Sequence, residues 1–262
     1  MTTPPPFPDP VPWVEEPPHR NALQRALAPL AAAGAFVLKF GALVFKIKFL
    51  GLAISMLVSI LGYTLFFGWT FAVGLVLLVL VHELGHLVVM RARGYETGLP
   101  VFVPFFGAFV KGGKQDETPY DSAWASLSGP IFGGLAAAAV VGLGEVYSSD
   151  FLNALGWFGL YLTVLNLSPI AFLDGGVPGA ALTRAELIGF IVVLATLLGT
   201  ITSAAVPILL VTAAYRLYKT WHGKQVLLLP PQQRAIVVTT YFVVIALSLL
   251  VMHDHQPVAR HL

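Results

Sequence analysis

Three residues within five positions have the types and spacing of a metal site. His82, Glu83 and His86 form H-E-x-x-H inside an apolar segment, about 69–90. Positions four apart share one face of a helix, so both imidazoles can bind one zinc ion, and Glu83 can take a proton from a water on the metal. The alternative is two structural histidines beside an interfacial glutamate. It is weakened by the location, because an ionised carboxylate near the bilayer centre costs about 2.5–3.5 kcal/mol.

A catalytic zinc usually has three protein ligands and a water, so a third ligand is expected elsewhere in the chain. Asp174 is the candidate, in NLSPIAFLDGG at the end of a second apolar segment, 152–172. Charge asymmetry predicts that this segment and 69–90 both run inwards, which brings Asp174 and the histidines to the same side at similar depth. Alone, Asp174 would more often be a loop residue that starts a turn. Beside H-E-x-x-H, it is predicted to be the third ligand.

The composition is that of a chain embedded in a lipid bilayer. Of 262 residues, 57% are hydrophobic and 11% are charged, against about 25% charged in soluble domains. The net charge of +2 and the lack of a basic block interleaved with aromatics exclude a nucleic-acid partner. The absence of cysteine excludes a disulfide framework and thiolate metal ligands. No secretory signal peptide is visible at the start of the sequence.

Apolar runs predict an all-α polytopic membrane protein with six to seven transmembrane helices. The predicted spans are about 49–67, 69–90, 126–144, 152–172, 187–218 and 235–252. The segment 187–218 is either one long helix or two short ones that meet around Thr200–Ser203. Two crossings put every Lys and Arg cluster inside, which favours seven spans with a cytoplasmic N-terminus.

The chain divides into four parts by composition. Residues 1–24 are predicted to be a proline-rich disordered tail, and 25–48 an amphipathic segment at the membrane surface. Residues 49–252 form the transmembrane domain that carries the candidate site. Residues 253–262 are a polar tail, for which we favour a solvated state over a second metal site despite three histidines.

Between the second and third predicted spans, the sequence changes from helical to β-type. The stretch 95–120 is rich in Gly, Pro and β-formers, which predicts a short re-entrant or cytoplasmic β segment. An edge strand within 99–114 could pair with an extended substrate backbone near the zinc. The alternative is a cytoplasmic connector that makes no substrate contact.

Small residues are expected to let the metal-bearing helix approach its neighbours. Gly129 and Gly133, in SGPIFGG, have the four-residue spacing that permits close helix contact. Gly85, inside H-E-x-x-H, would let a neighbouring span pack behind the metal. These glycines predict that the third span packs against the spans that carry the ligands.

Together, the two motifs resemble the site-2 protease family, the intramembrane zinc metalloproteases of the M50 type. HELGH is followed about ninety residues later by N-x-x-P-x-x-x-x-D-G-G, and the resemblance extends over about 50–180. It implies one zinc ion per chain held by His82, His86 and Asp174, with Glu83 as base. It also implies that Asn166 holds the substrate carbonyl or its oxyanion. By itself, an amide in a membrane helix is as readily explained by a hydrogen bond to a neighbouring helix.

The resemblance implies hydrolysis of a peptide bond within or next to the membrane segment of a single-span protein. The lack of cysteine and the small size favour a prokaryotic cytoplasmic membrane, and the charge asymmetry predicts a site towards the cytoplasmic side. The sequence departs from the family at Val177–Pro178, where relatives commonly have His or Arg, and it lacks room for PDZ or CBS modules. The other function considered is a membrane metal-binding protein without hydrolysis, such as a zinc transporter or sensor. Transporters tend to carry internal repeats, and none is found here.

Overall fold

The computed structural model describes residues 49–262 apart from 106, 202, 224–226 and 256–262. The predicted tail 1–24, the predicted surface segment 25–48 and most of the polar C-terminal tail therefore lie outside the described residues. Residues 253 and 254 belong to the last turn of a helix rather than to a tail.

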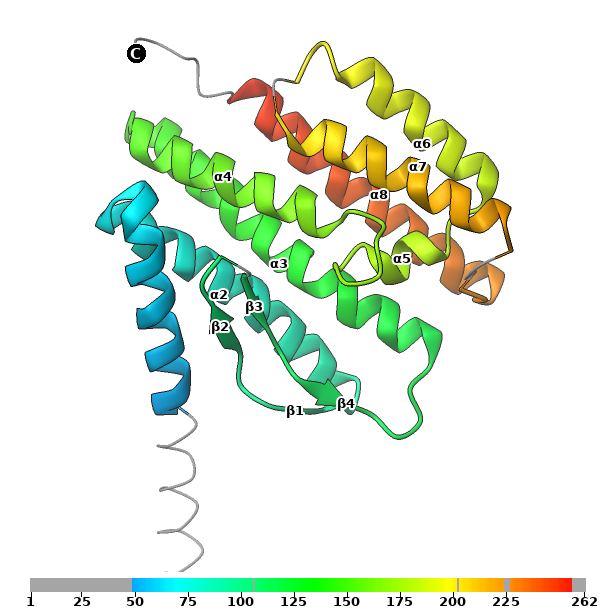
Figure 1. The fold of residues 1–262 in the computed structure, drawn as a ribbon, viewed down its shortest axis with the longest axis horizontal. Helices are drawn as coiled ribbons and strands as arrows, with labels where there is room; N and C mark the ends of the chain where they lie inside the picture. The colour runs from blue at the N-terminus through cyan, green and yellow to red at the C-terminus, as the bar shows by residue number, and fades with distance from the viewer. Residues whose placement is uncertain (1–48, 106, 202, 224–226, 256–262) are drawn as a thin grey trace, which may run out of the picture. The chain divides into compact units, whose positions relative to one another are not determined.

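The described chain is mainly helical, and four of its helices are long and apolar enough to cross a membrane (Figure 1). These four are Phe49–Phe67, α2 (Trp69–Ala92), α3 (Pro119–Val146) and α8 (Pro231–Asp254). Three further helices are shorter, with 17, 14 and 17 residues: α4 (Asp150–Asn166), α6 (Arg184–Leu197) and α7 (Ala205–Trp221). A 14-residue helix is about 21 Å long and the hydrocarbon core about 30 Å thick, so length alone does not yield the predicted six to seven spans.

The segment predicted as either one helix or two is two helices in the structure. α6 and α7 are separated at residues 198–204 and lie side by side (Figure 1). α6 begins at a capping box in which Thr183 and Glu186 satisfy each other's backbone amides. This is the arrangement that the seven-span topology requires.

Two helix boundaries differ from the predicted ones for local reasons. α3 begins at Pro119 rather than near 126, because Thr118 and Asp121 form a capping box and Pro119 occupies the first helical position. α4 ends at Asn166 rather than near 172. Pro169, which has no backbone N–H and disfavours a helical conformation in the residue before it, follows within three residues. A short helix, α5 (Gly176–Ala180), resumes after the break.

The predicted β-type segment is present between α2 and α3 as two small antiparallel pairs. The strands are β1 (Glu96–Thr97), β2 (Val101–Val103), β3 (Gly107–Phe109) and β4 (Gly112–Gly113). β2 pairs with β3, with Phe102 opposite Ala108, and β1 pairs with β4. β3 packs against α2 and, among the described strands, pairs only with β2, so its second edge is left without a strand.

Glycines bring α2, α3 and α4 into close contact, as predicted for the spans near the site. A Cβ atom at Gly85 of α2 would lie 2.7 Å from the Ser128 carbonyl oxygen of α3. A Cβ at Gly156 of α4 would lie 2.7 Å from the Ala137 carbonyl oxygen, also in α3. α8 packs across α3 and α4, and the Tyr241 hydroxyl donates to the Leu167 carbonyl just after α4 (2.6 Å).

Candidate metal centre

The two histidines of H-E-x-x-H lie on one face of α2, as their spacing predicts. Both are buried, with 7% and 9% of His82 and His86 exposed. Their Nε2 atoms are 3.2 Å apart, close enough to share one ion. The helix therefore presents two converging nitrogen donors.

Asp174 reaches these nitrogens because the chain folds back sharply after α4. The Gly175 amide donates to the Asn166 carbonyl across this break (2.7 Å). The turn has no room for a side chain at Gly175, where a Cβ would lie 2.1 Å from the Leu167 carbonyl oxygen. The glycine thus makes possible a compact loop that ends in Asp174 beside α2.

The three donor groups have the spacing of a zinc site. Asp174 Oδ2 is 3.0 Å from His82 Nε2, and Oδ1 is 3.3 Å from His86 Nε2. All three ligand atoms lie within 4.8 Å of one another. Ligands at 2.0–2.1 Å in a tetrahedron around zinc are about 3.3 Å apart, so the residues present fit the ion.

The orientation of His86 is fixed by a group that sequence reasoning did not find. Its Nδ1–H donates to the backbone carbonyl of Ala125 in α3 (2.7 Å), which leaves the lone pair of Nε2 for a metal. A main-chain carbonyl carries no residue-type signal, so no sequence pattern could have identified it.

The predicted packing glycines of α3 lie directly against the two imidazoles. A Cβ at Gly129 would be 2.1 Å from His86 Nε2, and a Cβ at Gly133 would be 2.9 Å from His82 Nδ1. The four-residue repeat of glycine in α3 thus faces the four-residue repeat of histidine in α2. Its role is to make room for the ligands as well as for the helix backbone.

Glu83 lies beside the donor set and is 4% exposed. Its Oε2 atom has no hydrogen-bond partner within the part of the chain that the structure describes. A buried carboxylate oxygen left without a partner is costly unless water or a ligand reaches it. Glu83 is therefore placed to receive a proton from a molecule bound next to the donor set.

Two cavities meet at this glutamate. Both are lined by His82, Glu83, Ala108 and Asn166. Gly107 continues the lining of one cavity, whereas Phe109 and Val110 continue that of the other. Strand β3 therefore runs along both cavities, with Ala108 at their junction.

Asn166 is half-buried at the last position of α4, on the lining of both cavities. The structure records no side-chain hydrogen bond from Asn166 to any described residue, so the helix-bridging alternative has no partner there. Its amide is available to a molecule in the cavities.

Comparison with known proteins agrees with the motifs. Residues 70–150, which include α2, the β segment and α3, match the family model described as peptidase family M50. Over this segment the chain is similar to peptidase family M50. It is also 32% identical, over 104 residues, to a Synechocystis sp. protein named as a putative zinc metalloprotease. That match covers 37% of this chain and 27% of the relative, so the chain spans about a quarter of its length.

The match to the family model and the relative's name confirm the resemblance inferred from the motifs. Together with the four apolar helices, the family match supports an integral membrane protein. The matched segment ends at residue 150 and so contains His82, Glu83 and His86 but not Asp174. Asp174 is joined to the two histidines by the geometry of the structure alone.

Proposed function

We propose that this chain is an intramembrane zinc metalloprotease that cleaves a peptide bond within or next to the membrane segment of a single-span protein. The observation that carries the proposal is that two imidazole nitrogens and one carboxylate converge on one another, next to a buried glutamate whose Oε2 has no partner among the described residues. Family M50 and the metalloprotease name of the relative support the same class of reaction.

His82, His86 and Asp174 would hold one zinc ion, which supplies a Lewis acid that lowers the pKa of a water molecule. Glu83 would accept a proton from a water molecule as that water attacks the substrate carbonyl carbon. The same carboxylic acid then gives the proton to the leaving amine nitrogen, so the carboxylate is regenerated. Burial of Glu83 keeps this proton away from bulk solvent between the two steps.

Asn166 is proposed to bind the substrate carbonyl oxygen. Its side-chain N–H can donate to this oxygen and strengthen the bond as negative charge develops on it. Its position on both cavities, together with Glu83, supports this role.

The substrate is proposed to lie extended along the open edge of β3. A protease must reach the carbonyl of one peptide bond, and a helix hides that bond in its own hydrogen bonds. Pairing with an edge strand holds a segment extended through main-chain hydrogen bonds. The course of β3 past both cavities, with Ala108 beside Glu83, supports this direction for the peptide.

The site is proposed to open towards the cytoplasm of a prokaryotic cell. His82 and His86 lie 10 and 6 residues before the end of α2 at Ala92, which corresponds to about 15 and 9 Å of helix. Arg91 and Arg93 at that end support its assignment to the cytoplasmic side by the positive-inside rule. Water then has a short path to the metal.

Replacing the base tests the proposal. In liposomes containing a single-span substrate, Glu83→Gln should lower kcat by at least about a hundredfold, since general-base catalysis contributes roughly 10²–10⁴. Zinc content should be unchanged, because Glu83 is not a ligand. Glu96→Gln, which alters an exposed glutamate of β1, is the matched control.

Undiminished cleavage by Glu83→Gln would refute the mechanism. Zinc flux into liposomes, blocked by the loss of His82 or Asp174, would instead favour the transporter. A protease should show no zinc flux into liposomes.

A further inference from the structure

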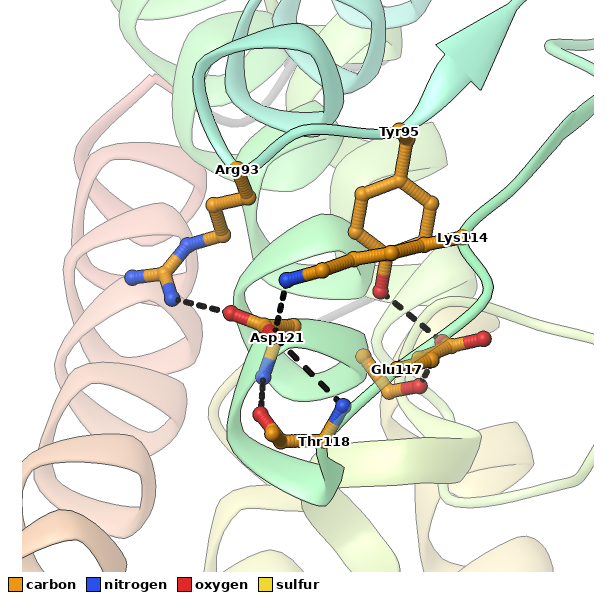
Figure 2. Close-up of polar contacts among 7 residues, drawn as sticks. Arg93, Tyr95, Lys114, Glu117, Thr118 and Asp121 are labelled. Atoms are coloured by element: carbon orange, nitrogen blue, oxygen red, sulfur yellow. Dashed lines mark hydrogen bonds and ion pairs between the residues drawn. The ribbon is translucent and has the colours of Figure 1, made fainter.

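A polar cluster joins three elements where α2 ends, the β segment returns and α3 begins (Figure 2). Asp121 lies at its centre and is 9% exposed. Its Oδ1 accepts from Arg93 Nη1 at 2.9 Å, and its Oδ2 accepts from Lys114 Nζ at 2.7 Å. Thr118 completes the set through the capping box at the start of α3. One carboxylate thus binds a cation from the end of α2 and a cation from the β segment.

Aromatic side chains enclose the same cluster. The Arg93 guanidinium lies over Tyr120, 5.1 Å from the ring centroid, and 5.6 Å from that of Trp124. Tyr95, which is 6% exposed, donates its hydroxyl to Glu117 (2.8 Å). The three elements are therefore fixed by packing as well as by charge.

The residues bound by Asp121, and Asp121 itself, are each only a few residues along the chain from a group at the candidate active site. Arg93, the C-cap residue that directly follows α2, lies seven residues after His86. Lys114 directly follows β4, and β4 follows β3, which lines both cavities. Ala125, whose carbonyl orients His86, lies one helical turn after Asp121 in α3.

We propose that Asp121 is a positioning residue that holds the β3 edge in register with the metal-bearing helix. It does so by binding Arg93 and Lys114 at the same time. Without this carboxylate, Arg93 and Lys114 repel each other, so the ionic link between the end of α2 and the β segment is lost. The expected effect on cleavage rests on the proposed function, whereas the effect on the β segment does not.

In the cleavage assay, Asp121→Asn should raise KM by about tenfold, with a smaller change in kcat, since a misplacement of about 1 Å can cost up to a hundredfold. Zinc content should stay at the wild-type level. Lys114→Met should reproduce the rise in KM. It replaces Asp121→Asn as the test if Asp121→Asn fails to fold. Asp116→Asn removes the same charge from an exposed position of the same loop and should behave as wild type.

A second measurement does not need activity. The chain has no cysteine, so a spin label at Lys111→Cys, between β3 and β4, has no background. In the full-length protein in liposomes, Asp121→Asn and Lys114→Met should make this label more mobile, and Asp116→Asn should not. An immobile label in both variants, or an unchanged KM in an active enzyme, would overturn the inference. If the wild-type protein cleaves no substrate, the proposed function fails. The mobility of the spin label then tests the positioning role of Asp121 by itself.

Discussion

The imidazole of His86 occupies the space that a side chain at Gly129 would need. A Cβ atom at Gly129 would lie 2.1 Å from His86 Nε2, the nitrogen that faces Asp174. Helix α3 is thus shaped to the ligand and not only to the backbone of α2. A methyl group at this position would act on the metal site directly.

Gly129→Ala should therefore weaken zinc binding. The imidazole must rotate away from Asp174 or lose its bond to the Ala125 carbonyl, and the loss of such support typically costs about 10–100-fold in metal affinity. Competition with a chromophoric chelator measures the change. Gly142→Ala is the matched control. Gly142 lies on the same helix as Gly129, and a Cβ atom there would meet no other atom within 4 Å. Equal zinc affinity in both variants would contradict the argument.

Asn166→Ala should lower kcat and leave zinc content unchanged. Removing one donor to a developing oxyanion costs about 10²–10³ in kcat. Single-turnover cleavage in liposomes measures the effect. Asn153→Ala, near the other end of α4, removes an amide that bonds to Glu145 far from the metal centre and serves as control. A variant with normal kcat but a lower melting temperature would show that Asn166 holds helices together instead.

The raised pKa of the Tyr95 phenol should lower the free energy of unfolding at high pH. Burial, together with the hydrogen bond to Glu117, raises the pKa of Tyr95 from 10.0 to about 12. Between these values the unfolded chain has lost the proton and the folded chain still holds it, so unfolding becomes easier as pH rises. One proton corresponds to at most about 1.4 kcal/mol per pH unit.

Unfolding in detergent, followed from pH 9 to 12, measures this slope. Tyr95→Phe should show less dependence on pH than wild type, and Tyr147→Phe, which alters an exposed tyrosine, should not differ from it. Parallel curves for Tyr95→Phe and wild type would exclude a contribution from this phenol.

The sequence was most informative where residue type and spacing alone carry the chemistry. H-E-x-x-H indicated two ligands on one helical face, and the predicted common direction of the two segments pointed to Asp174 as the third. The break around Thr200–Ser203 was also recognised as one of two alternatives. The end of α4 was misplaced because hydropathy continues past Pro169 while the helix does not.

Other features were beyond sequence reasoning or were overlooked. The Ala125 carbonyl is a main-chain group, and the pairing of Phe102 with Ala108 depends on a register that no local pattern specifies. The capping box of Thr118 and Asp121 has a recognisable spacing and could have been found, which would have started α3 at Pro119. The second use of Asp121, as the acceptor for two distant cations, follows only from tertiary structure.

The separation of the ligands along the chain has a consequence for biosynthesis. His82 and His86 are translated early, but Asp174 lies 92 residues after His82. A nascent or truncated chain that stops before α4 holds only two nitrogen donors, one fewer than the three protein ligands usual in catalytic zinc sites. If the chain has the proposed function, its metal site therefore stays incomplete until α4 and the loop that carries Asp174 have been synthesised.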